Sequence, residues 1–169
     1  LVAVVGTICD QATSEDDGLV FHAESVVGEA IVEAAEYSGV RARFLATLGR
    51  ARVRLHTDVG FGDVVVPEPV LVQLPTLLDF APPTLRGYSR ESAIAEKLQA
   101  MVYLDEINSR MKDFYDIWLL ASRFSFDGAT LAAAIRATFD RRSTTLPAVP
   151  LSLSDEFVAR RDKQTQWVA

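Results

Sequence analysis

Two stretches of alternating apolar and polar residues, joined at a glycine, stand out in the first half of the chain. From Val40 to Leu48 apolar residues alternate with basic or polar ones, Leu45 being the exception, and the alternation resumes after Gly49 from Ala51 to Val59. A period of two is typical of a strand with one packed and one polar face. The pattern therefore predicts an antiparallel hairpin.

The segments on either side of this hairpin are shorter or less clear. Residues 16–18 form a turn sequence that leads into a short predicted strand, Leu19 to His22. The stretch Val26 to Tyr37 has the Ala and Glu content of a helix but also β-branched pairs that suit a strand. We favour a strand, because an isolated hairpin is only marginally stable. The prolines between Val70 and Tyr88 predict an extended connector.

The second half carries the signals of helices. Ser89 can cap a helix that runs through Val102, and apolar residues recur at helical spacing from Met111 to Ser122. Two more helices are predicted, one opening at Asp127-Gly128 and one from Asp155 to Val168. The fold class expected is α+β, with a β-rich part over residues 1–82 and a helical region over residues 83–169.

Composition narrows the class of protein. The chain has 169 residues, 49% hydrophobic and 24% charged, as in an ordinary globular domain. A net charge of −6 argues against a protein that coats nucleic acid by bulk charge, although a locally basic groove remains possible. The single Cys9 allows no internal disulfide, no Cys/His zinc pattern is present, and no apolar run approaches the roughly 20 residues of a membrane helix. These features predict a cytoplasmic protein that does not enter a membrane.

Asp58 is the first candidate for chemistry. On the predicted strand it shares the polar face with Arg54 and His56, next to the glycine-rich turn Gly60-Phe61-Gly62. A carboxylate there could hold a divalent ion or act as a base. The alternative is that Asp58 only pairs with Arg54 or caps the turn, and this is the commoner fate of a surface carboxylate.

Lys97 and a pair of aspartates are the second candidate. Lys97 borders the apolar stripe of its predicted helix, so it could snorkel into water or direct its ammonium into a cleft as a phosphate ligand. Asp113 and Asp116 are three residues apart on one helical face, and Arg110 precedes Asp113 by the same interval. Such a group forms either a salt-bridge cluster or the polar wall of a pocket.

Five segments, in this order along nearly the whole chain, resemble the nucleotidyltransferase family of AbiEii/AbiGii-type toxins. They are Asp16-Asp17-Gly18-Leu19, Tyr37-Ser38-Gly39-Val40-Arg41, Thr57-Asp58-Val59-Gly60-Phe61-Gly62-Asp63, Ala95-Glu96-Lys97 and Ser109-Arg110-Met111-Lys112-Asp113-Phe114-Tyr115-Asp116. The resemblance implies a polymerase-β-like nucleotidyltransferase core with a helical C-terminal region. It also implies transfer of a nucleotide from a nucleoside triphosphate, with Mg²⁺, to a tRNA or protein acceptor, in a type IV toxin–antitoxin or phage-defence system with an antitoxin partner.

The resemblance also assigns roles to residues. Asp58 corresponds to the third acidic residue of the active site, where it would bind metal or act in catalysis, and Lys97 to the lysine that contacts the triphosphate. The segment from Lys112 to Asp116 matches the family's basic-Asp-x-x-Asp motif, whose aspartates would orient the lysine or the nucleotide. The residues predicted to bind the nucleotide are Lys97, Arg110, Lys112, Asp113 and Asp116.

One family motif has no counterpart in these 169 residues, namely the Gly-Ser or Gly-Gly turn followed by an Asp-x-Asp pair that holds the metals. We therefore expect the chain to be the C-terminal two-thirds of such an enzyme, to bind nucleoside triphosphate weakly and not to catalyse the reaction alone. The alternative is a catalytically inactive binding module that contacts RNA or a protein partner. In that case the stripe Arg41, Arg43, Arg52 and Arg54 would be its interaction surface.

Overall fold

The computed structural model describes residues 1–11, 17–33 and 37–168, and only the backbone of residues 32, 33, 37 and 38. The chain forms two compact units, Leu1–Gly62 and Asp63–Ala169. Its antiparallel sheets and helices confirm the expected α+β class. Asp16, the first residue of the first family segment, lies outside the described residues.

The first unit is a helix on a three-stranded antiparallel sheet. Helix α1 (Val2–Cys9) is followed by β1 (Leu19–Glu33), β2 (Tyr37–Leu48) and β3 (Ala51–Gly60) in the spatial order β1-β2-β3. The alternating pattern predicted the hairpin correctly, since Leu48 pairs with Ala51 around a two-residue loop. The strand interpretation of the ambiguous stretch is confirmed as far as residue 33, and residues 34–36 lie outside the described part.

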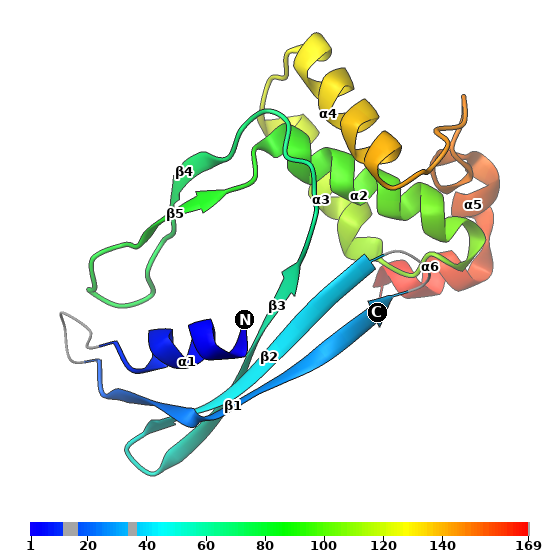
Figure 1. Cartoon of the computed structure of the whole chain (residues 1–169). Coiled ribbons are helices and arrows are strands. Elements are labelled where there is room, and N and C mark those ends of the chain that lie inside the picture. The colour runs from blue at the N-terminus through cyan, green and yellow to red at the C-terminus, as the bar shows by residue number, and fades with distance from the viewer. Residues whose placement is uncertain (12–16, 34–36, 169) are drawn as a thin grey trace. The chain divides into compact units, whose positions relative to one another are not determined.

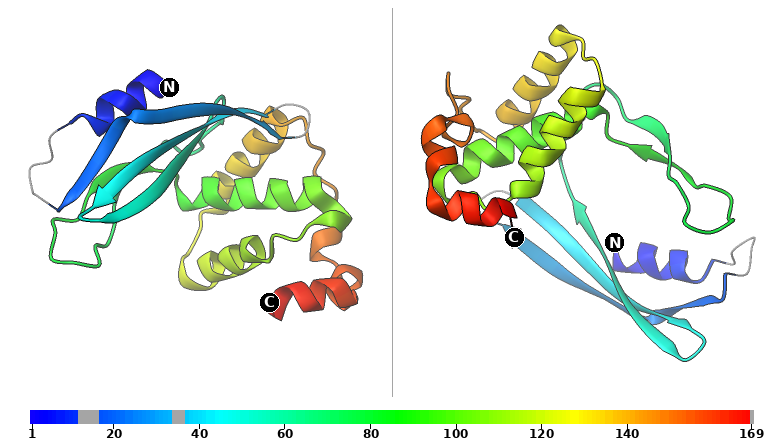
Figure 2. Two further views of the ribbon diagram at one scale, coloured as in Figure 1. Left: turned by 90° about the horizontal axis from the view of Figure 1, so that it is seen from below. Right: turned by 180° about the vertical axis from the view of Figure 1, so that it is seen from behind.

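The two faces of this sheet differ in the way that the alternation predicts. Ala42 and Ala46 are fully buried on the apolar face, where Phe21 and Phe44 pack together. Figures 1 and 2 show α1 lying along the sheet, and the close approach of Val2 to Gly28 places the helix against β1. The opposite face carries the arginines.

An irregularity in β1 distorts one edge of the sheet. Pairing with β2 jumps from His22–Leu45 to Val27–Arg43, so four residues of β1 lie opposite Phe44 alone. The hydroxyl of Ser25 accepts a hydrogen bond from the Leu45 N–H at 2.9 Å, which satisfies a donor that the interrupted ladder leaves open.

The second unit opens with a small hairpin that the sequence did not predict. β4 (Val70–Gln73) and β5 (Thr84–Gly87) pair in antiparallel fashion within the stretch expected to be an extended connector. Pro82 lies between the two strands. In Figure 1 the hairpin extends away from the helices that follow it.

The rest of the second unit is helical, as expected. α2 (Arg90–Leu104) packs against α3 (Met111–Arg123) and most extensively against α4 (Gly128–Arg141), and Figure 2 shows α2 running beside both. Short turns η1 (Asp105–Ile107) and η2 (Leu151–Leu153) connect the helices. The cap predicted at Ser89 is confirmed, since Ser89 accepts from the Ser92 N–H. The helix predicted to open at Asp127-Gly128 begins there, and Asp127 accepts from the Thr130 N–H.

The C-terminal helix differs from the prediction. It is broken into α5 (Asp155–Ala159) and α6 (Arg161–Val168), because Arg160 adopts an extended backbone conformation between them. The core of the unit comprises Ile94, Ala95, Met101, Ala134, Phe139 and Phe157. No helix among those described has both the length and the apolar character needed to cross a membrane.

Candidate functional site

Lys97 lies at the centre of a charged cluster between α2 and α3. Its Nζ donates to Asp113 Oδ1 at 2.8 Å and lies 2.7 Å from Asp116 Oδ2. The three side chains are only 15–24% exposed, so they are partly shielded from water. The structure therefore brings together the lysine and the two aspartates that the sequence singled out.

Lys97 and Asp116 are both biased toward their charged forms. Burial alone would lower the pKa of Lys97, but the hydrogen bonds to Asp113 and Asp116 outweigh burial and raise it above its ordinary value. The hydrogen bond from Lys97 is also the main cause of the lowered pKa of Asp116. Lys97 is therefore a fixed cation at neutral pH. An ammonium has three N–H donors, and its partners among the described residues are the two aspartates, so a third donor can serve a ligand oxygen.

Local structure explains why these residues meet. Asp113 and Asp116 are one helical turn apart at the start of α3, and η1 turns the chain back so that this face meets α2. The turn is fastened by the fully buried Asn108, whose Oδ1 accepts from the Arg110 N–H at 2.9 Å. The nearly buried Lys163 of α6 donates to the backbone oxygen of Asn108 at 2.8 Å. This last contact has no local signal in the sequence, because it joins residues 55 positions apart.

The other two residues of the predicted nucleotide site take different places. Lys112 is largely exposed and reaches Asp116 Oδ2 at 3.0 Å, an i,i+4 pair on the outer side of the cluster. Arg110 occupies the N-cap position of α3, and among the described residues its guanidinium forms no ion pair with Asp113. The cluster thus consists of two lysines and two aspartates and is nearly neutral overall.

Asp58 lies on β3 in the other unit, where it is bound by an arginine. Arg41 donates to both carboxylate oxygens, Nε to Oδ1 and Nη2 to Oδ2, at 2.7 Å each. This bond is the main cause of the lowered pKa of Asp58. An ion pair between Asp58 and Arg54 was the alternative to a chemical role that the sequence left open. An ion pair is present, but its partner is Arg41 and not Arg54. The hairpin loop contains the signal: if Leu48 faces Ala51, then Arg41 faces Asp58.

A magnesium site was tested against the donors that the described residues provide. Within residues 1–11, 17–33 and 37–168, no group of three or more His, Cys, Asp or Glu side chains could hold a metal ion. Both oxygens of Asp58 are engaged by Arg41, and Asp113 and Asp116 are engaged by lysines. In this arrangement the carboxylates are engaged by cationic side chains and do not form a metal centre.

A second charged network, which the sequence did not suggest, adjoins α2. Arg142 follows α4, and its guanidinium donates to Glu96, to Gln99 at 2.7 Å and to Asp63 at 3.5 Å. The hydroxyl of Tyr88 donates to Asp63 at 3.1 Å. Burial raises the pKa of Glu96, and burial together with Asp63 raises the pKa of Tyr88 to about 12. The network joins the N-terminal segment of this unit, α2 and the end of α4.

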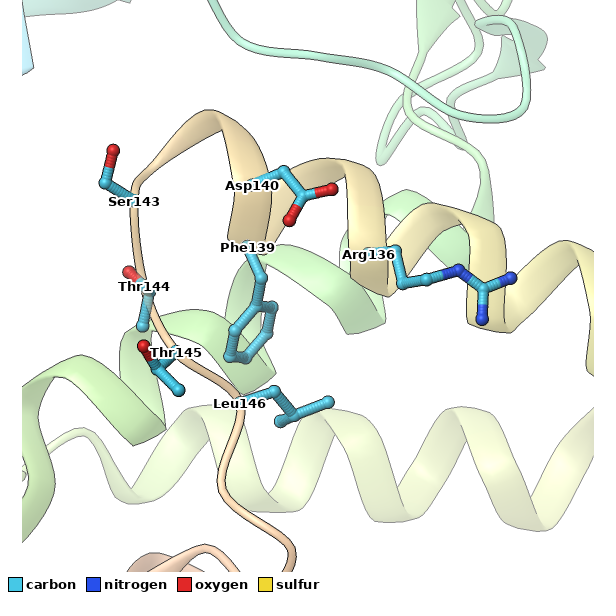
Figure 3. A pocket seen from close by; sticks show the side chains of 7 residues that line it. All are labelled: Arg136, Phe139, Asp140, Ser143, Thr144, Thr145 and Leu146. Carbon is cyan, nitrogen blue, oxygen red and sulfur yellow. The ribbon is translucent and has the colours of Figure 1, made fainter.

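A pocket of about 540 Å³ opens beside the C-terminal end of α4. Figure 3 shows Phe139 directed from the helix toward Leu146 in the segment that follows, with Thr144 and Thr145 on the same side. None of the residues that the sequence analysis predicts for a functional site lines this pocket.

Comparison with known proteins identifies the family. The model of the family described as "Nucleotidyl transferase AbiEii toxin, Type IV TA system" matches residues 1–169, the entire chain. Searches among curated proteins and among solved structures gave no match. Because the match spans the full sequence, as the five segments had indicated, the chain belongs to the AbiEii nucleotidyl transferase toxin family of type IV toxin–antitoxin systems.

Proposed function

We propose that this chain takes part in nucleotidyl transfer by binding the triphosphate of a nucleoside triphosphate at Lys97, with Asp113 and Asp116 as positioning residues. The observation that carries the proposal is the placement of the Lys97 ammonium, which two carboxylates hold at 2.8 and 2.7 Å while the side chain keeps 24% exposure. A partly exposed cation in a fixed position can bind a phosphate oxygen without first losing its conformational freedom.

The chemistry of the reaction explains why such a lysine is useful. Nucleotidyl transfer separates pyrophosphate from the nucleotide, so negative charge increases on the phosphate that leaves. A fixed cation beside that phosphate stabilises the developing charge. The raised pKa of Lys97 keeps the ammonium protonated throughout the neutral range.

The proposal extends to the acceptor of the nucleotide, the biological setting, the partner and the metal ion. The nucleotide acceptor would be a tRNA or a protein, the setting a cytoplasmic phage-defence system, and the partner an antitoxin, as the type IV toxin–antitoxin family implies. In the family reaction Mg²⁺ accompanies the triphosphate, and Asp58 stays a predicted ligand or base whose carboxylate would have to exchange Arg41 for the ion.

The proposal is tested by titrating the chain with ATP and GTP while amide NMR resonances are followed. Weak binding, with a dissociation constant of about 1 mM, is expected because a single ammonium supplies the contact. The shifts should concentrate on α2 around Lys97 and on the first turns of α3, and Lys97→Ala should abolish them. Arg123→Ala is the matched control, since it removes the same charge from an exposed position in the last turn of α3. Unchanged shifts in Lys97→Ala would exclude this site.

A further inference from the structure

The four arginines on the polar face of the first unit's sheet fall into two pairs with different surroundings. Arg41 is bound at both nitrogens by Asp58, and Arg43 lies 3.1 Å from Glu29 Oε2. These two are neutralised by carboxylates on neighbouring strands. They hold the sheet together across β1, β2 and β3.

Arg52 and Arg54 have no such partners. The register places them opposite Thr47 and Leu45, and within the described part of the chain no carboxylate comes within ion-pairing distance of either guanidinium. Both side chains are exposed, and they belong to β3, which has a neighbouring strand on one side only. Two residues apart on one face, they lie about 7 Å from each other, and no ion pair with the described residues compensates their mutual repulsion.

The two unpaired arginines border a shallow depression of about 520 Å³ in the same face. The residues that line it include all four arginines and His56, which follows Arg54 on the same face of β3. Four arginines face two carboxylates here, whereas the whole chain has a net charge of −6. The depression is thus a local positive site on an acidic protein.

We propose that this depression binds the phosphate backbone of a single-stranded polynucleotide, with Arg52 and Arg54 as the phosphate ligands. A guanidinium offers a planar fork of donors to a phosphate, and its face can stack on an unpaired base, as can the ring of His56. An open, sequence-tolerant groove of arginines with a flat ring beside it is the arrangement that single strands use. The depression belongs to the first unit and the Lys97 cluster to the second, and polynucleotide binding at the depression does not require nucleotide to bind at Lys97.

The test measures binding of fluorescently labelled single strands of about 16 nucleotides, a length that covers one binding site of this kind. RNA and DNA of the same sequence are compared by fluorescence anisotropy in EDTA, so that neither metal nor nucleoside triphosphate contributes. The variant is Arg52→Ala/Arg54→Ala. The matched control is Arg123→Ala/Arg136→Ala, which removes the same charge from exposed helical positions.

The expected effect follows from counterion release. Loss of two phosphate contacts should lower the slope of log K against log salt by about 1.4 and weaken binding about 25-fold at 0.1 M salt. The control pair and Lys97→Ala should bind as the unchanged chain does. An Arg52→Gln/Arg54→Gln variant with an unchanged circular dichroism spectrum should show the same loss, which separates lost contacts from lost fold.

Several results would overturn the proposal. One is the absence of binding at low salt, and another is an equal loss of affinity in the control pair. A third is displacement of the strand by polyglutamate at the same charge concentration, which would indicate a surface for acidic polypeptides. Binding of RNA, DNA or both with the expected dependence on Arg52 and Arg54 supports it, and the ratio of the two affinities identifies the preferred polymer.

Discussion

Replacing Arg142 by methionine should make the stability of this chain depend on pH in a defined direction. Arg142 donates hydrogen bonds to Glu96 and Gln99, and the side chains of Arg142 and Glu96 are only 24% and 18% exposed. The methionine keeps much of the packing volume but removes the charge. Glu96 is then a largely buried carboxylate without its cation, and Asp63 remains nearby with the same sign of charge.

The size of the effect can be estimated from the burial of the pair. Breaking a fully buried ion pair by removing one partner costs about 3–5 kcal/mol. Because both side chains retain some contact with water, we expect a loss of about 2 kcal/mol in the free energy of unfolding near pH 7.5. With a urea dependence of about 2 kcal/mol per molar for a chain of this size, the midpoint should fall by about 1 M.

The direction of the pH dependence follows from Glu96. In the native protein burial already raises the pKa of Glu96 above its ordinary value of 4.5, while Arg142 lowers it in part. Without Arg142 the pKa in the folded state rises further. An acid with a raised folded pKa stabilises the fold below its unfolded pKa and loses that contribution as pH rises through the folded pKa. The deficit of Arg142→Met should therefore be largest near pH 7.5 and shrink toward about pH 5.

The assay is urea unfolding followed by circular dichroism at both pH values. The double variant Glu96→Gln/Arg142→Met completes the cycle, because a neutral amide removes the buried charge that causes the loss. It should recover at least half of the deficit near pH 7.5 and show little change in the deficit with pH. A deficit of equal size at both pH values, or a double variant as unstable as Arg142→Met, would refute the reasoning.

Three further predictions concern contacts within each of the two units. Lys97→Ala should lower the free energy of unfolding by about 1–2 kcal/mol, because two half-buried carboxylates lose their shared cation. Lys112→Ala should change the free energy of unfolding by less than about 0.5 kcal/mol, because Lys112 is exposed. Thermal unfolding measures both, and equal effects would contradict the difference in burial. Gly28→Ala places a Cβ 2.6 Å from Val2 Cγ2 and should increase hydrogen exchange in α1, an increase that Val2→Ala should reverse if this contact is the cause. Phe157→Ala removes a side chain that is 3% exposed and should cost about 3–5 kcal/mol in chemical unfolding, and a loss below about 1 kcal/mol would show that the site collapses.

The sequence predicted those features whose causes are local. The β2–β3 hairpin follows from alternation around Gly49, whose positive φ of 56° suits the loop, and the starts of α2 and α4 follow from the caps Ser89 and Asp127. Each signal lies within a few residues of the structure that it specifies. Elements of this kind could be placed without knowledge of the fold.

The features that the sequence missed depend on contacts or conformations with no local mark. β4 and β5 have only four residues each, too few for a period to be recognised, and prolines separate them. The break at Arg160 contains neither Gly nor Pro. The Glu96–Arg142 pair joins positions 46 residues apart, so only the packing of α4 on α2 brings the two charges together.

The candidate site was predictable only where its arrangement has a local cause. Helical spacing placed Asp113 and Asp116 on one face, but only the turn fastened by Asn108 and Lys163 directs that face toward Lys97. The Arg41–Asp58 pair was within reach, because the hairpin loop fixes its register. What the alternation could not reveal is that Arg43 also acquires a carboxylate partner, since that depends on pairing with Glu29 in β1.

The two cationic surfaces differ in a way that matches the ligands proposed for them. Lys97 is fixed in position by Asp113 and Asp116, but its charge is balanced by them, so a triphosphate gains orientation there more than attraction. Arg52 and Arg54 are exposed and form no ion pair with the described residues, so they attract a polyanion over a distance but hold no single geometry. Adding salt should therefore weaken polynucleotide binding at Arg52 and Arg54 far more than nucleotide binding at Lys97. The reason is that several counterions leave the polynucleotide when it binds to the two arginines.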